Sequence, residues 1–145
     1  MRPRAGFSLA EMMAVVLILG MIAAFSVPAI SKYLTGWNLQ SGHTTVVSEL
    51  KLLRQKAISQ GLSLRVWFSP GSNMYWFQHP RTGVWTMYRL PNRVNFVTVS
   101  FAGGPYDTYM EPDGRSRRAG RIVLANTAGR RDTVDVDLSG WVGRP

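Results

Sequence analysis

Residues 7–30 read FSLAEMMAVVLILGMIAAFSVPAI and carry a single charge, Glu11. As an α-helix rising 1.5 Å per residue, this stretch would extend about 36 Å, which is enough to cross the core of a bilayer. The residues before it, MRPRAG, are basic, and the sequence from Ser31 onward mixes polar and apolar residues. The pattern predicts a membrane-spanning helix that anchors a soluble body of roughly 115 residues, the usual size of one domain.

The basic leader differs from a secretory signal peptide in the order of its parts. A signal peptide is cut after its apolar region, whereas here the small residue Gly6 stands before the apolar stretch. Cleavage after Gly6 would therefore leave the apolar stretch on the mature chain as an anchor. Arg2 and Arg4 predict that the leader stays on the cytoplasmic side and that the body lies outside.

Glu11 is an unusual residue for an apolar helix. A carboxylate within a spanning helix costs about 2.5–3.5 kcal/mol on insertion scales, so it normally has a partner or a function. One interpretation places Glu11 close enough to the membrane interface to stay hydrated. The other pairs it with a cation on a neighbouring helix, and cleavage after Gly6 would create such a cation at the amino group of Phe7.

The run Gly6-Phe7-Ser8-Leu9-Ala10-Glu11, followed by about twenty apolar residues, closely resembles the class III leader of type IV pilins and type II secretion pseudopilins. The resemblance implies that a prepilin peptidase cuts between Gly6 and Phe7 and methylates the new amine of Phe7. It also implies that Glu11 acts in subunit assembly and that Pro28 is the proline that pilin helices commonly carry. The implied partners are other pilins or pseudopilins, met through the N-terminal helix in the inner membrane.

The body begins with an amphipathic helix. Apolar residues recur at three- and four-residue spacing, with His43 in the same stripe, and Gly61 is typical of a helix C-terminus. The apolar members of this stripe are Leu39, Val46, Leu50, Leu53 and Ala57. His43 on this stripe predicts a core or interface residue and not a metal ligand.

Beyond Gly61 the apolar period changes to two, which indicates strands. Strands are predicted at residues 62–69, 73–79, 84–90, 94–101, 121–126 and 133–138, with a last edge at Trp141 and Val142 and a loop at 102–120. The predicted fold class is α+β and pilin-like: a long N-terminal helix, transmembrane then amphipathic, packed on an antiparallel β-sheet or a small β-sandwich. The predicted divisions are a cleaved leader (1–6), a transmembrane and assembly helix (7–30), its amphipathic continuation (31–61) and a β-rich globular domain (62–145).

The body adds to the resemblance. The segment ELKLLRQKAISQG at 49–61 looks like the helix of H-type minor pseudopilins and FimT-like minor pilins. The C-terminal third of the chain also resembles these proteins. It has an acidic–Pro–Asp–Gly turn ending at Gly114, a strand that follows Gly120, and a strand ending at Gly140. The resemblance implies a minor subunit of a type II secretion pseudopilus or of a type IV pilus tip or priming complex. Its alternative is a DNA-binding minor pilin for natural transformation.

Catalytic and metal-binding patterns do not appear in the sequence. It has no cysteine and two histidines, His43 and His79, and it lacks the nucleophile elbow and the phosphate-binding loop. Asp132, Asp135 and Asp137 lie close together but without the oxygen-rich loop of a calcium site, so we interpret them as a solvated face. We expect no enzyme, no cofactor and no metal.

The formal charge of +9 suggests nucleic acid, anionic lipid or an acidic partner as the ligand. Six arginines fall within seventeen residues: Arg115, Arg117, Arg118, Arg121, Arg130 and Arg131. Arg suits phosphate contacts, and Tyr106, Tyr109 and Trp141 could stack on bases. Gly114-Arg115-Ser116-Arg117 has the letters of a pattern by which some FimT-like pilins bind DNA, but here it precedes the last strand pair. The other interpretation is a solvated loop and turn.

Overall fold

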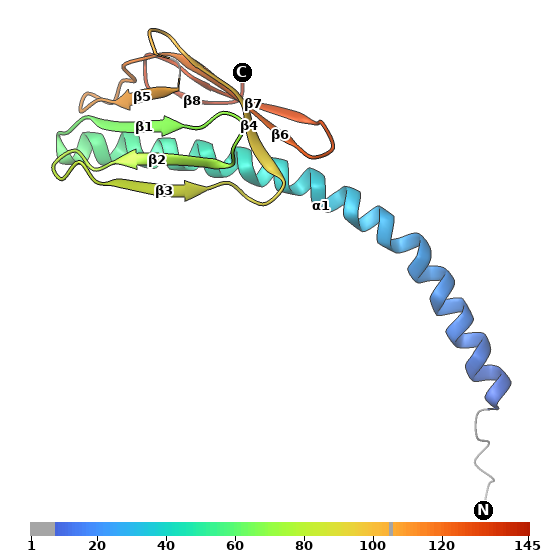
Figure 1. Ribbon diagram of the computed structural model, residues 1–145. Coiled ribbons are helices and arrows are strands. Elements are labelled where there is room, and N and C mark those ends of the chain that lie inside the picture. The colour runs from blue at the N-terminus through green and yellow to red at the C-terminus, as the bar shows by residue number, and fades with distance from the viewer. Residues whose placement is uncertain (1–7, 105) are drawn as a thin grey trace, which may run out of the picture. The chain divides into compact units, whose positions relative to one another are not determined.

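The computed structural model describes residues 8–104 and 106–145, without the side chains of residues 25–35. Gly6 and Phe7 lie outside the described residues. The chain divides into two compact units, Met1–Leu34 and Thr35–Pro145. The described elements are α1 (Leu9–Gln60), β1 (Leu64–Phe68), β2 (Met74–Gln78), β3 (Trp85–Arg89), β4 (Val94–Phe101), β5 (Asp107–Met110), β6 (Gly120–Asn126), β7 (Arg131–Val136) and β8 (Val142–Gly143). Figure 1 shows the strands gathered along the C-terminal part of α1.

The C-terminal part of α1 buries the apolar stripe that its spacing predicts. Val46, Leu50 and Ala57 are at most 1% exposed, and Leu39 and Leu53 are also buried. The helix ends in a Schellman motif, because Gly61 has a φ of +64° and the Leu62 N–H donates to the Ala57 carbonyl at 3.2 Å. The predicted helix face and its glycine cap are therefore confirmed.

The first sheet is antiparallel, in the order β3-β2-β1-β5. Strands β1 and β2 alternate as the sequence predicts: Leu64, Val66 and Phe68 of β1 are buried, and the residues between them are half-buried. Tyr75 and Phe77 continue the inner face on β2. The opposite face of this sheet points to solvent.

The second sheet is antiparallel, in the order β4-β6-β7-β8. Strand β4 has a bulge, since pairing with β6 passes from Phe96 to Thr98 and leaves Val97 unpaired. The bulge keeps both Phe96 and Val99 buried although they lie three positions apart. Phe68 of β1 contacts Phe96 edge-on, with ring centroids 5.4 Å apart, so the inner faces of the two sheets share one core.

Two sequence predictions are wrong in this region. The predicted loop at 102–120 contains strand β5, which pairs with β1. Strand β7 begins two residues earlier than predicted and ends at Val136, because Asp137 opens a turn in which the Gly140 N–H donates to its carbonyl at 2.9 Å. β5 has no apolar alternation to reveal it: Thr108 is fully buried and bonds the Ser116 hydroxyl at 2.9 Å.

Candidate processing and assembly site

The N-terminus of α1 is fixed by a reciprocal pair of hydrogen bonds. The Glu11 N–H donates to the Ser8 Oγ at 3.2 Å, and the Ser8 N–H donates to the Glu11 Oε2 at 2.9 Å. The Met12 N–H donates to the Ser8 carbonyl at 3.2 Å and closes the first turn. This is a capping box, which satisfies two backbone donors that a helix start leaves free. The spacing Ser-x-x-Glu signals this role of Glu11, which was not among the sequence predictions.

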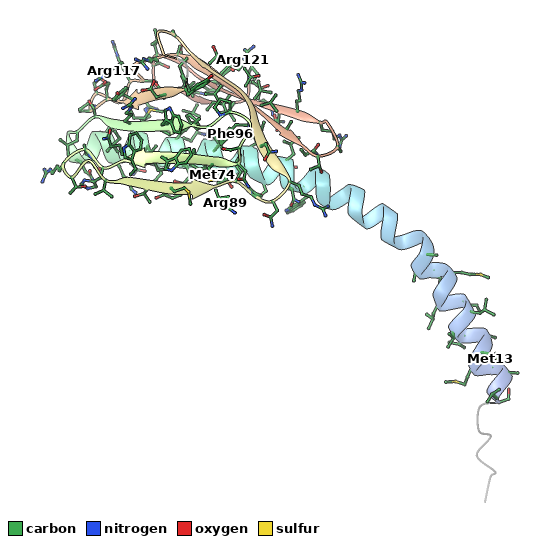
Figure 2. All side chains as sticks on the ribbon, in the orientation of Figure 1. Met13, Met74, Arg89, Phe96, Arg117 and Arg121 are labelled. Carbon is green, nitrogen blue, oxygen red and sulfur yellow. The ribbon has the colours of Figure 1, made fainter. Side chains whose placement is uncertain are left out.

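The first turns of α1 expose apolar side chains on all sides. Exposure runs from 49% at Val15 to 80% at Leu9, and the stretch from Val15 to Leu19 is exposed at every position. Consecutive positions turn by 100°, so five of them cover the whole circumference of the helix. Figure 2 shows these side chains extending around the helix near Met13. A helix that is apolar all round is normally covered by lipid or by other helices.

The apolar segment of α1 contains Pro28, and the helix continues through this residue, whose side chain is not described. Among the helices of the described residues, none is both long enough and apolar enough to cross a membrane.

The late arginines do not form one patch. Arg115, Arg117 and Arg118 lie between β5 and β6, whereas Arg130 and Arg131 lie at the far end of β6. Seven residues of strand separate these two groups, which corresponds to about 20 Å. Arg121 lies on β6, and Figure 2 labels it together with Arg117.

Four of the six arginines have acidic partners. Arg117 pairs with Glu111 at 2.6 Å and lies over the ring of Tyr109, with its guanidinium 4.2 Å from the centroid. The other pairs are Arg118 with Asp107, Arg121 with Asp135 at 2.7 Å, and Arg115 with Asp113 at 3.8 Å. In the part of the chain that the structure describes, Arg130 and Arg131 form no ion pair.

The three late aspartates each have a different partner. Asp135 accepts two hydrogen bonds from Arg121, at 2.7 and 2.8 Å, which lower the pKa of its carboxyl and raise the pKa of Arg121. The Ser139 hydroxyl donates to Asp137 at 2.8 Å and lowers the pKa of that carboxyl. Asp132 pairs with Arg144 at 2.6 Å. Across the described residues, no group of three His, Cys, Asp or Glu could hold a metal ion.

The late glycine pattern has a structural basis. Gly114 and Gly140 both have positive φ, at +82° and +79°. A Cβ on Gly140 would lie 2.0 Å from the Gly114 carbonyl oxygen. That same oxygen accepts a hydrogen bond from Arg54 Nε of α1 at 2.7 Å. The two glycines thus let the turn before β8 and the turn after β5 meet at the helix.

His43 lies half-buried on the inner face of α1, as its position in the stripe predicts. Its Nε2 is buried and has no hydrogen-bond partner within the described residues. The environment is that of a packed side chain.

Comparison with known proteins finds a motif at the N-terminus and a likeness of fold. Residues 1–27 match the model of the prokaryotic N-terminal methylation motif. The fold is that of the minor pseudopilins and minor pilins, so the chain combines a prepilin-type leader with a pilin-like fold. No curated protein sequence matches it.

Two solved structures illustrate the likeness of fold. One is the minor pseudopilin EpsH from the type 2 secretion system of Vibrio cholerae, at 14% identity and a TM-score of 0.58, covering 74% of this chain and 96% of that one. The other is the type IV minor pilin FimU of Pseudomonas aeruginosa, at 10% identity and a TM-score of 0.58, covering 74% of this chain and 87% of that one.

Proposed function

We propose that the protein is a minor pseudopilin or minor pilin, a non-catalytic subunit of a type II secretion pseudopilus or of the tip or priming complex of a type IV pilus. The N-terminal methylation motif and the pilin-like fold support this function together. A prepilin peptidase cuts between Gly6 and Phe7 and methylates the amine of Phe7. The leader lies in the cytoplasm, the apolar part of α1 lies in the inner membrane, and the body lies outside.

The observation that carries the assembly role is the exposed apolar surface at the start of α1. Val16, Leu17 and Ile18 are each 58% or more exposed, with no packing partner among the described residues to cover them. Burying such side chains is worth about 1.5–3 kcal/mol each, so this surface favours lipid before assembly and neighbouring subunit helices afterwards. Glu11 lies at the end of this surface, where it can meet the amine of Phe7 from the next subunit.

The capping box allows the two roles of Glu11 to be separated. Gln at the third helical position caps as Glu does but carries no charge. We expect Glu11→Gln to keep the helix start and processing at Gly6 while the protein disappears from sheared filament fractions. Glu11→Ala should lose both the charge and the cap.

The measurement is immunoblotting of filament and membrane fractions from the producing cells, with the mass of the mature N-terminus recorded for each variant. Ser8→Ala is the matched control, because it removes the cap and keeps the charge. Filament incorporation of Glu11→Gln at the wild-type level would contradict the charge role. A mature chain that begins at Met1 would contradict the proposed function itself.

A further inference from the structure

The first four strands carry no acidic residue, whereas β5, the remaining strand of the first sheet, carries Asp107 directly opposite Trp67. The sequence has no Asp or Glu between Glu49 and Asp107, although seven basic residues fall in that span. Strands β1, β2, β3 and β4 all come from it. Any charge that these strands present to solvent is therefore positive.

The outer face of the first sheet carries large aromatic side chains. Trp67 of β1 lies directly opposite Trp76 of β2, on the two central strands, and their ring centroids are 4.9 Å apart. On the edge strand β3, Trp85 and Met87 continue the same face and are 40% and 54% exposed. Three of the chain's five tryptophans therefore lie on one solvent-facing surface, which we call the tryptophan face.

A guanidinium completes this surface. Arg65 and the three tryptophans line an open pocket of about 440 Å³. The Arg65 guanidinium lies 5.6 Å from the ring centroid of Trp85 and 5.5 Å from that of Tyr109. Asp107 holds it there through an ion pair at 2.8 Å. The pocket thus has aromatic walls and a guanidinium that is held in place by a carboxylate.

Unpaired positive charge lies on β3 and in the two turns that flank it. Arg89 is an exposed residue of β3, and Arg81 and Arg93 lie exposed in the turns before and after that strand. Within residues 8–104 and 106–145, these three side chains form no ion pair. They differ in this from four of the six late arginines, whose charge is balanced by a neighbouring carboxylate.

We propose that the tryptophan face binds single-stranded nucleic acid. Bases stack on aromatic side chains whatever their sequence, and arginines follow the phosphates. A four-stranded antiparallel sheet that presents aromatic rings from its central strands is also how RNA-recognition domains stack two or three bases. Duplex DNA does not fit, because its bases are already stacked and paired. At its β5 edge the tryptophan face adjoins Arg117 and Arg118, whose guanidinium groups lie near the ring of Tyr109. The site needs no filament partner.

The test uses residues 35–145, which form a compact unit that contains all the buried apolar residues that the structure describes. The probe is oligothymidylate of about 16 nucleotides, and the readout is quenching of tryptophan fluorescence in a salt series. An abasic strand of the same length and inorganic polyphosphate supply phosphates without bases. We expect the oligothymidylate to quench and to bind at least about fivefold more tightly than the abasic strand.

The variants separate stacking from charge. Trp85→Ala should weaken binding at least about fivefold, while Trp85→Phe should retain most of it because the ring face is kept. Arg89→Gln should weaken binding and reduce the salt slope by about 0.7. Trp141→Ala and Arg131→Gln are matched controls, because they remove an exposed indole and an unpaired arginine from other parts of the body. Both should bind as the wild type does.

Three results would overturn the proposal. One is equal binding of the abasic strand or polyphosphate, which would mean that charge alone attracts the ligand. Another is an equal loss in Arg131→Gln and Arg89→Gln, and the third is no quenching at low salt. If the third result came with self-association that Trp85→Ala abolishes in sedimentation, the tryptophan face would be a protein interface instead.

Discussion

Gly140 lies at a close contact that joins several elements of the body. Its φ of +79° is unfavourable for any residue with a Cβ, and its hydrogen faces the Gly114 carbonyl without room for a methyl group. Arg54 bonds the same carbonyl from α1. The contact therefore ties the turn before β8, the turn after β5 and the helix to one point.

Gly140→Ala should be strongly destabilising. Gly129 is the matched control, since its φ is +77° and nothing lies within 4 Å of a Cβ there. The backbone conformation alone should cost about 1–2 kcal/mol in Gly129→Ala. Gly140→Ala should lose about 1–3 kcal/mol more of the free energy of unfolding because of the clash. Urea denaturation of residues 35–145 measures both losses. Equal losses in the two variants would show that the close contact at Gly140 does not affect the free energy of unfolding.

At the scale of elements, the pairing of β6 with β7 combines backbone and side-chain interactions. Arg121 and Asp135 are direct neighbours in the register, and they form two hydrogen bonds across the strands. The contact lowers the pKa of Asp135. A carboxyl whose pKa falls on folding stabilises the protein above its ordinary pKa, and that stabilisation is lost as the pH falls through the folded value.

Asp135→Asn should therefore change the pH dependence of stability. At pH 7 the variant should melt below the wild type by a small margin, because the pair is exposed. The margin should shrink as the pH drops below about 4, where the unpaired carboxyl is protonated. Thermal melts across this range measure it, and Arg121→Gln should give the same profile. A margin that is constant with pH would contradict the linkage.

At the scale of the whole molecule, the core lies entirely within one unit of the chain. The described buried apolar residues run from Leu39 to Val142 and come from α1 and from both sheets. Gly42 of α1 lies against Val94 of β4, where a Cβ would come within 3.1 Å of the valine side chain. The helix is therefore an integral part of the body's core.

Residues 35–145 should fold alone in a single cooperative transition. The expected result is coincident thermal melting by far- and near-ultraviolet circular dichroism. A chain of residues 62–145 is the control, and it should not fold, because it leaves the sheets without Leu50, Leu53 and Ala57. Separate melting of the two sheets in the longer chain would contradict a common core.

Much of the fold could be predicted from local pattern. The buried stripe of α1, its end at Gly61 and strand β4 at residues 94–101 follow the sequence closely, because apolar spacing reports directly which side chains face a core. Strand β5 could not be predicted. Asp107 and Thr108 are buried there through Arg65, Arg118 and Ser116, and these partners become neighbours only after folding.

The candidate sites divide in the same way. The leader Gly6 to Glu11 is a local signal, so the sequence alone predicts processing, the apolar helix and the pilin-like class. Only the tertiary structure decided which arginines have an acidic partner and which do not. It places carboxylates beside Arg117, Arg118 and Arg121, which the sequence presents as one basic cluster, and it leaves Arg89 unpaired beside the tryptophans. The physical reason is that the leader is a pattern of residues consecutive in the chain. The pairing of arginines with carboxylates and the contacts between tryptophan rings depend instead on distances between residues that folding brings together.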